Sequence, residues 1–85
     1  MMNSIIEYDY SKLRGKIREI FHTETRFARE LGISKVNLSA KLNGRLNFSL
    51  NEISRISRIF NLKEKEMFDY FFIRKSAKPG LREDG

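Results

Sequence analysis

The 85-residue chain contains no cysteine. Without thiols it cannot form disulfides, thiolate zinc sites or a cysteine nucleophile, and this absence suits a reducing compartment. It also has no apolar run of membrane-spanning length, and its first ten residues, MMNSIIEYDY, lack the layout of a signal peptide. We therefore expect one small soluble domain in the cytoplasm, near the size at which a core without cross-links is only marginally stable.

Groups that support catalysis are equally scarce. The single histidine, His22, falls at the expected end of a helix, where a surface or capping role is much commoner than a role as ligand or base. There is no metal-ligand spacing, no glycine-rich phosphate loop and no Ser, His and Asp set with an arguable geometry. We expect no enzyme activity, no metal or other cofactor, and no small-molecule ligand.

The positive charge is concentrated in one part of the chain. The formal net charge is +6. Residues 11–61 hold eleven Lys or Arg against four Glu, which gives +7, whereas residues 1–10 contribute −2 and residues 62–85 contribute +1. A compact basic domain is typical of proteins that bind a polyanion, although many basic proteins bind no nucleic acid.

Residues 11–21 form the first predicted helix, with Ser11 as its N-cap. Gly15 in its interior costs about 1 kcal/mol relative to Ala, so it either weakens the helix or marks a close contact with a neighbouring helix. Four apolar residues share the expected inward face: Leu13, Ile17, Ile20 and Phe21. The bases on the other faces are equally suited to solvent and to phosphate: Lys12, Arg14, Lys16 and Arg18.

Two short helices joined by a tight turn are predicted within residues 23–44. Thr23 or Thr25 caps the first, and Gly32 ends it because glycine adopts a left-handed conformation at little cost. Ser34 caps the second helix, which ends at Asn43-Gly44. The residues expected to face inward are Phe27, Ala28, Leu31, Leu38 and Leu42.

Two further helices are predicted after this pair. The first begins with a capping box, Ser49-Leu50-Asn51-Glu52. Its inward face is expected to hold Leu50, Ile53, Ile56 and Phe60. The second covers about residues 63–72. We predict an N-terminal arm at residues 1–10, a domain at residues 11–73 and a flexible tail at residues 74–85.

The spacing of three small or apolar residues is typical of a helix-turn-helix. Ala28 is small enough to let the two helices cross closely, Gly32 permits the turn, and Leu38 anchors the second helix in the core. Any pair of helices with a glycine cap can produce this spacing. Together with five short helices and the local charge of +7, it favours DNA binding.

The chain resembles the Cro/CI type of helix-turn-helix, the lambda-repressor-like or XRE-like domain, over residues 11–72. More narrowly, it is similar to short Cro-like regulators encoded by bacteriophages and prophages of Gram-positive bacteria, in the segments KLRGKIREIF, FARELGIS, LSAKLNGRLNFSLNEI and YFF. The resemblance implies an all-α, compact five-helix fold whose third helix lies in the major groove of double-stranded DNA. The residues that it assigns to base edges are Lys35, Val36, Ser39 and Ala40, with Asn37 bridging to a base or a phosphate.

The resemblance also implies contacts with the DNA backbone, from the start of the second helix and the loop after the third. These positions are Thr23, Thr25, Arg26, Asn43, Arg45 and Asn47. The chain departs from the family at Glu24, where the usual residue is Gln and where a carboxylate repels phosphate. It departs again at Lys41, where many relatives bury an aliphatic residue; we expect Leu42 to take the core position and Lys41 to lie near the DNA.

Four aromatic residues near the end of the chain exceed what one short helix can bury: Phe68, Tyr70, Phe71 and Phe72. Core closure accounts for two of them, and the cluster is therefore a candidate subunit contact. A homodimer, at least on DNA, suits this class of protein because two copies read half-sites about 34 Å apart.

The function that fits these features is a transcriptional regulator that binds a specific operator and excludes polymerase. A protein-interaction module of the antirepressor kind is an alternative, favoured by Glu24 and by a third helix with only Lys35 and Lys41 charged. A DNA-binding antitoxin is a second alternative, which an adjacent toxin gene would identify.

Overall fold

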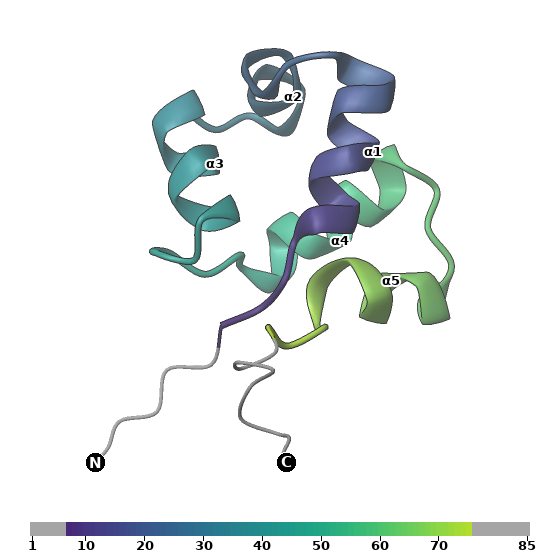
Figure 1. Cartoon of the computed structure of the whole chain (residues 1–85). Helices are drawn as coiled ribbons and strands as arrows, with labels where there is room; N and C mark the ends of the chain where they lie inside the picture. Colours follow the sequence, from purple (N-terminus) through teal and green to yellow (C-terminus); the bar gives the residue numbers. More distant parts are fainter. Residues whose placement is uncertain (1–6, 76–85) are drawn as a thin grey trace, which may run out of the picture.

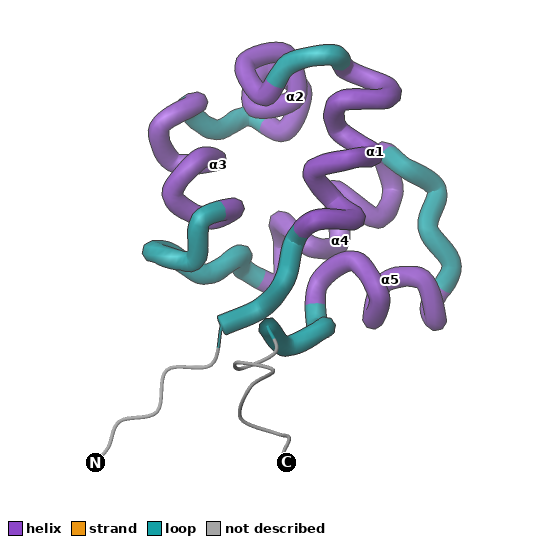
Figure 2. The backbone as a smooth tube through the Cα atoms, viewed as in Figure 1, coloured by secondary structure: helices purple, strands orange, loops and turns teal. Residues whose placement is uncertain are grey.

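The computed structural model describes residues 7–75, and five α-helices make up most of that range (Figures 1 and 2). The helices are α1 (Ser11–Phe21), α2 (Glu24–Leu31), α3 (Lys35–Leu42), α4 (Leu50–Ile59) and α5 (Glu64–Phe71). The prediction of a compact all-α fold with five helices is confirmed. None of these helices is long and apolar enough to cross a membrane.

Three of the helices begin at the polar caps that the sequence contains. Thr23 Oγ1 accepts from the Arg26 amide at 3.1 Å, which selects Thr23 over Thr25 as the cap of α2. Ser34 caps α3 in the same way, and Ser49 forms a reciprocal capping box with Glu52 at the start of α4. Each cap satisfies an amide that the first helical turn leaves without a partner.

The predicted cap of α1 is wrong. Ser11 is the first helical residue, and its amide donates to Asp9 Oδ1 at 2.8 Å. The Asp9 carboxylate therefore caps the start of α1, the role that the sequence predicts for the Ser11 hydroxyl. The Ser11 hydroxyl also donates to Asp9, and these two bonds lower the pKa of the Asp9 carboxyl.

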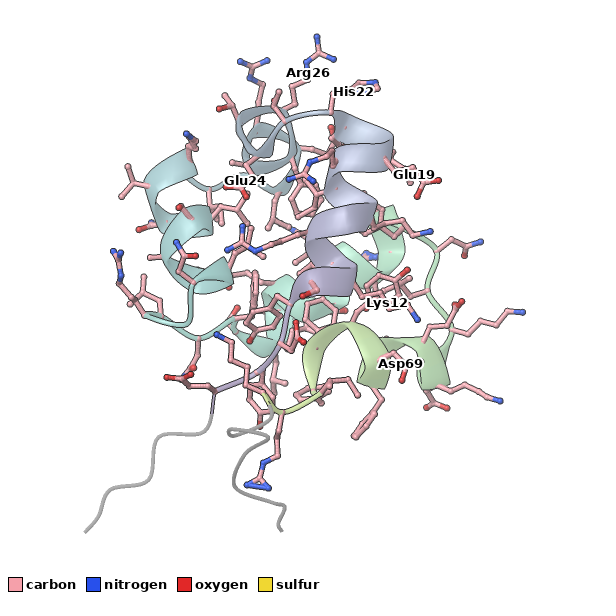
Figure 3. All side chains as sticks on the ribbon, viewed as in Figure 1. Lys12, Glu19, His22, Glu24, Arg26 and Asp69 are labelled. Atoms are coloured by element: carbon pink, nitrogen blue, oxygen red, sulfur yellow. The ribbon has the colours of Figure 1, made fainter. Side chains whose placement is uncertain are left out.

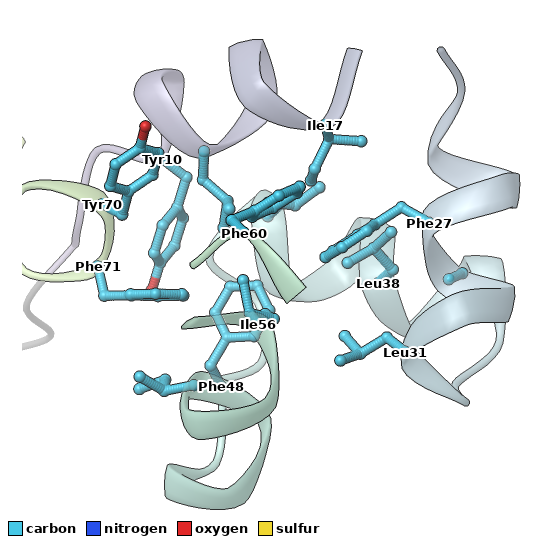
Figure 4. Close-up of a cluster of buried hydrophobic side chains, with 14 residues drawn as sticks. Tyr10, Ile17, Phe27, Leu31, Leu38, Phe48, Ile56, Phe60, Tyr70 and Phe71 are labelled. Carbon is cyan, nitrogen blue, oxygen red and sulfur yellow. The ribbon is translucent and has the colours of Figure 1, made fainter. Parts of the chain in front are cut away.

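A continuous apolar core joins the five helices (Figure 4). α1 packs against α2 and α5, and α2 packs against α3 and α4. Phe27 and Phe60 stack near the centre, with ring centroids 5.2 Å apart. The core contains Tyr10, Leu13, Ile17, Phe27, Ala28, Leu31, Leu38, Leu42, Phe48, Ile53, Ile56, Phe60, Tyr70 and Phe71.

Two apolar residues predicted to face inward are exposed. Leu50 is 81% exposed even though it follows the apolar spacing of α4, because it is the first residue at the end of the helix. Ile20 is half-exposed at the edge of the stripe through Leu13, Ile17 and Phe21. Of the two alternatives for Gly15, close contact with a neighbouring helix is excluded, since a Cβ there would meet nothing within 4 Å in the described range.

The two ends of the described chain pair with each other. The Asp9 amide donates to the Ile73 carbonyl at 2.7 Å, and the Lys75 amide donates to the Glu7 carbonyl at 2.8 Å. Between these bonds Tyr8 lies opposite Arg74 in an antiparallel bridge. In Figure 1 the two coloured ends of the chain lie side by side. Ordered contacts therefore extend beyond the predicted limits of the domain at residues 11 and 73; residues 1–6 and 76–85 lie outside the described range.

Candidate nucleic-acid interface

The turn between α2 and α3 is built by Gly32. Its φ of +86° is the left-handed conformation that glycine adopts without strain, and its amide donates to the Ala28 carbonyl at 2.8 Å. The Ile33 amide bonds to the same carbonyl at 3.0 Å. Ala28 itself is almost completely buried, so α2 and α3 pack closely here, and the outer face of α3 is turned to solvent.

The outer face of α3 presents the residues that were predicted to read bases. Lys35, Val36 and Asn37 are exposed, and Val36 is 76% exposed even though it is apolar. One turn further along, Ser39 and Ala40 are half-buried. A single shallow hollow brings together Lys35, Val36, Ser39, Ala40 and Arg45. Asn37 lies outside this hollow, and its backbone N–H donates to the hydroxyl of Ser34, the N-cap of α3.

The flanks of α3 hold most of the residues that were predicted to contact phosphate. At the start of α2, Thr25 and Arg26 are exposed, and Figure 3 shows Arg26 and His22 extending from this end of the molecule. Beyond α3, Arg45 and Asn47 are exposed in the loop before α4. A second hollow beside the first flank contains Arg14, Ile17, Arg18, His22, Thr23, Glu24, Thr25 and Lys35.

Lys41 is not available to DNA in the way that was predicted. Its ammonium lies 3.0 Å from the Glu52 carboxylate, donates to the Asn47 carbonyl at 3.0 Å and sits over the Phe48 ring. Its side chain is only 13% exposed. Leu42 does take the buried position as expected. Lys41 nevertheless points toward the loop and α4, because a carboxylate and a carbonyl lie there to receive it.

Glu52, the partner of Lys41, has a shifted pKa. Burial disfavours its ionised form and opposes the shift, but the bonds from the Ser49 amide, the Lys41 ammonium and the Ser49 hydroxyl outweigh that effect. The pKa of Glu52 is therefore lower than its ordinary value of 4.5. At neutral pH the ionised Glu52 carboxylate pairs with Lys41, and this pair closes the loop after α3.

Arg14 is a further basic residue whose partners the sequence did not reveal. Arg14 Nη1 donates to Glu24 Oε2 at 3.0 Å, and Arg14 Nη2 donates to Asn43 Oδ1 at 2.7 Å. Glu24, which stands where Cro/CI-type domains usually have Gln, therefore has a cationic partner. The only sequence signal was a base on a predicted helix, and the pairings span 10 and 29 positions of the chain.

The aromatic cluster divides into two pairs. Tyr70 and Phe71 are buried in the core, so their assignment to a subunit contact is wrong; they close the core against Phe48 and α1. Phe68 is 57% exposed and Phe72 is also exposed, and their ring centroids lie 6.2 Å apart. Phe68 and Phe72 are four positions apart and lie on one side at the end of α5, whereas Tyr70 and Phe71 point to the other side, so one short helix cannot bury all four rings.

Comparisons with known proteins agree with this architecture. The family model described as Protein of unknown function (DUF739) matches residues 6–74. One similar solved structure is the solution structure of the modulator of repression (MOR) of the temperate bacteriophage TP901-1 from Lactococcus lactis. It shares 36% sequence identity, with a TM-score of 0.68 over 78% of this chain and 89% of that chain. No curated protein matches the chain significantly.

Proposed function

Because this chain belongs to the DUF739 protein family and is homologous to a phage modulator of repression, we propose that it regulates phage transcription by binding double-stranded DNA at specific sites. A phage regulatory role follows from the homology. The observation that supports DNA binding is the outer face of α3, where Lys35, Val36, Ser39 and Ala40 share one hollow with Arg45. In this proposal α2 and α3 act as a helix-turn-helix of the Cro/CI type.

The residues of α3 have the chemistry needed to distinguish base pairs. Lys35, at the start of the helix, donates to the guanine O6 and N7 acceptors in the major groove. Val36 and Ala40 offer apolar surfaces for the methyl group of thymine, and Ser39 pairs with either a donor or an acceptor. Asn37, outside the hollow, bridges to a base or a phosphate at the edge of the site.

Affinity in this proposal comes mainly from phosphate contacts on either side of α3. One flank uses Thr23, Thr25 and Arg26 at the start of α2, and the other uses Asn43, Arg45 and Asn47 in the loop after α3. Backbone contacts of this kind orient a protein on the duplex but carry no sequence information. With Lys41 turned inward, Lys35 is the lysine of α3 that has no ion pair with any residue from 7 to 75, so these flanks provide most of the positive charge.

A second copy of the chain is the proposed partner on DNA. Phe68 and Phe72 form a small exposed aromatic surface on α5, which has Glu64 and Glu66 at its start and is followed by Arg74 and Lys75. Two antiparallel copies of this surface bring acidic and basic ends together. The aromatic area is far smaller than the roughly 800 Å² that each partner of a stable dimer buries, so association is expected to require DNA.

Binding to a repressor protein is the second candidate function. The similar solved structure is that of a modulator of repression, and the exposed apolar side chain of Val36 suits a protein surface as well as a thymine methyl group. In that case the hollow on α3 would receive a partner side chain, and regulation would act on the repressor instead of its operator.

The two candidates separate in one titration series. The protein is titrated against a set of operator-sized duplexes of different sequence at several salt concentrations, with and without a phage repressor protein. Sequence-selective binding whose affinity falls with salt supports direct regulation. Binding without preference for any candidate operator rejects it. Tight binding to the repressor, with no salt-dependent binding to DNA alone, selects the second candidate.

A further inference from the structure

Arg14 joins three helices at the edge of the proposed DNA-binding face. From α1, its Nη1 donates to the Glu24 carboxylate at the start of α2, at 3.0 Å. Its Nη2 donates to Asn43 Oδ1 at the end of α3, at 2.7 Å. One guanidinium therefore contacts both flanks from which phosphate contacts are proposed.

Glu24 introduces a negative charge beside one of these flanks. It lines the same hollow as Thr23, Thr25 and Lys35. An unpaired carboxylate there would repel the phosphates that these residues are proposed to contact, and repulsion between partly exposed charges several ångströms apart is substantial at low salt. Arg14 offsets this charge locally, because its guanidinium hydrogen-bonds to the carboxylate.

The second bond of Arg14 fixes the orientation of the Asn43 amide. Arginine has only donors, so the Asn43 group that faces it must be the oxygen, Oδ1. The amino group, Nδ2, then faces away from Arg14 as a donor. A phosphate oxygen is an acceptor, so this orientation is the one that suits a backbone contact from the exposed end of α3.

We infer that Arg14 is a positioning residue for DNA binding, which cancels the charge of Glu24 and orients the Asn43 amide toward the DNA backbone. The inference rests on the proposed function and deepens it, since it names the group that makes a carboxylate compatible with this surface. Arg14 acts through its two partners, both of which it holds from a different helix.

If Arg14 had a purely structural role, Arg14→Ala would lower the unfolding temperature of the protein. Both members of the Arg14 and Glu24 pair are partly exposed, and such pairs contribute little to folding. Arg14→Ala should therefore unfold at nearly the same temperature as the wild-type chain. The effect of the substitution should appear in DNA affinity, and it should depend on whether the carboxylate of Glu24 is present.

The test is a double-mutant cycle on the duplex that the wild-type chain selects from a random DNA pool. Affinity is measured for the wild type, Arg14→Ala, Glu24→Gln and the double variant. We expect Arg14→Ala to weaken binding about tenfold, but about threefold or less in the Glu24→Gln background. Arg18→Ala is the matched control. Arg18 is also a base on α1 and lines the same hollow, but it makes no bond to Glu24 in the described range. Its effect should therefore not depend on Glu24.

Asn43→Asp tests the second contact of Arg14. The variant keeps an oxygen acceptor for Arg14 but replaces the Nδ2 donor with an acceptor that repels phosphate. It should fold normally and bind the same duplex more weakly, with no change in base preference. Unchanged affinity would show that the Asn43 amide does not face the DNA.

The outcomes distinguish this inference from the proposed function. Equal losses from Arg14→Ala in both Glu24 backgrounds, alongside normal wild-type binding, would overturn the inference and leave DNA binding intact. A lower unfolding temperature that accounts for the lost affinity would assign Arg14 a structural role instead. If the wild-type chain selects no duplex from the pool, the proposed function itself fails.

Discussion

The ammonium of Lys41 lies 3.0 Å from the carboxylate of Glu52, and this pair joins the last turn of α3 to the first turn of α4. The two side chains are 13% and 18% exposed. Lys41 also holds the Asn47 carbonyl, so it closes the loop that presents Arg45. Lys41, which was expected near DNA, instead holds the loop of Arg45, which is proposed to contact phosphate.

Lys41→Ala should lower the free energy of unfolding by about 1 to 3 kcal/mol, because it leaves the shielded Glu52 carboxylate with fewer partners. Urea unfolding followed by circular dichroism measures this loss. Lys12→Ala is the control: Lys12 pairs with Asp69 at 3.8 Å, but both side chains are about half-exposed. Its loss should stay below about 1 kcal/mol, and similar losses from the two variants would contradict the role given to Lys41.

Acid should destabilise the protein partly through Glu52. Since its folded pKa lies below the ordinary value of 4.5, its ionised form stabilises the fold above that value. This contribution is lost as pH falls from 4.5 through the lower folded pKa. Unfolding temperatures measured between pH 7 and pH 3 should decline less steeply for Glu52→Gln. Asp9, whose pKa is also lowered, titrates in both proteins, so parallel curves would show that Glu52 contributes nothing to this decline.

Substitutions of Lys35 and Arg45 should affect DNA binding in different ways. Lys35→Ala should relax base preference at one position and cost about 1 to 3 kcal/mol if Lys35 reads guanine. Arg45→Ala should weaken binding to all duplexes alike and reduce the salt dependence. Selection from a random pool with each variant measures both effects. A changed base preference for Arg45→Ala would assign that residue to the bases instead.

The two glycines in the first half of the fold should respond in opposite directions to alanine. Gly32→Ala forces a side chain into a φ of +86° and should cost about 1 to 2 kcal/mol. Gly15→Ala lies within α1, where a Cβ meets nothing within 4 Å, and should stabilise the protein by about 0.5 to 1 kcal/mol. Thermal unfolding of both variants measures these changes. An unchanged unfolding temperature for Gly32→Ala would contradict the left-handed conformation of Gly32.

Phe68 and Phe71 are neighbours on α5 with different expected roles. Phe71→Ala removes a ring that is 1% exposed and should cost about 3 to 5 kcal/mol of stability. Phe68→Ser changes an exposed ring and should alter stability by less than about 1 kcal/mol. It should instead reduce cooperative binding to a duplex with two half-sites. Unchanged cooperativity would remove Phe68 from the proposed contact between copies.

The helices and their boundaries were largely predictable because local chemistry sets them. Ser34 and Ser49 begin helices by accepting amide hydrogens three residues ahead, and Gly32 ends one by its conformational freedom. Residues near the helix ends were less predictable. Leu50 continues the apolar spacing of α4 and is nevertheless exposed, and Asp9 takes the capping role expected of Ser11.

For the candidate site, the sequence alone determined which residues lie on α3 and at its turn, since helical periodicity separates Leu38 and Leu42 from the outer face. Only the tertiary structure decided which partners the charged side chains bind. Lys41 meets Glu52, and Arg14 meets Glu24 and Asn43, across separations that leave no periodic pattern. The physical reason is that caps and periodicity act within a few residues, whereas a long charged side chain takes its partner from whichever element packs beside it.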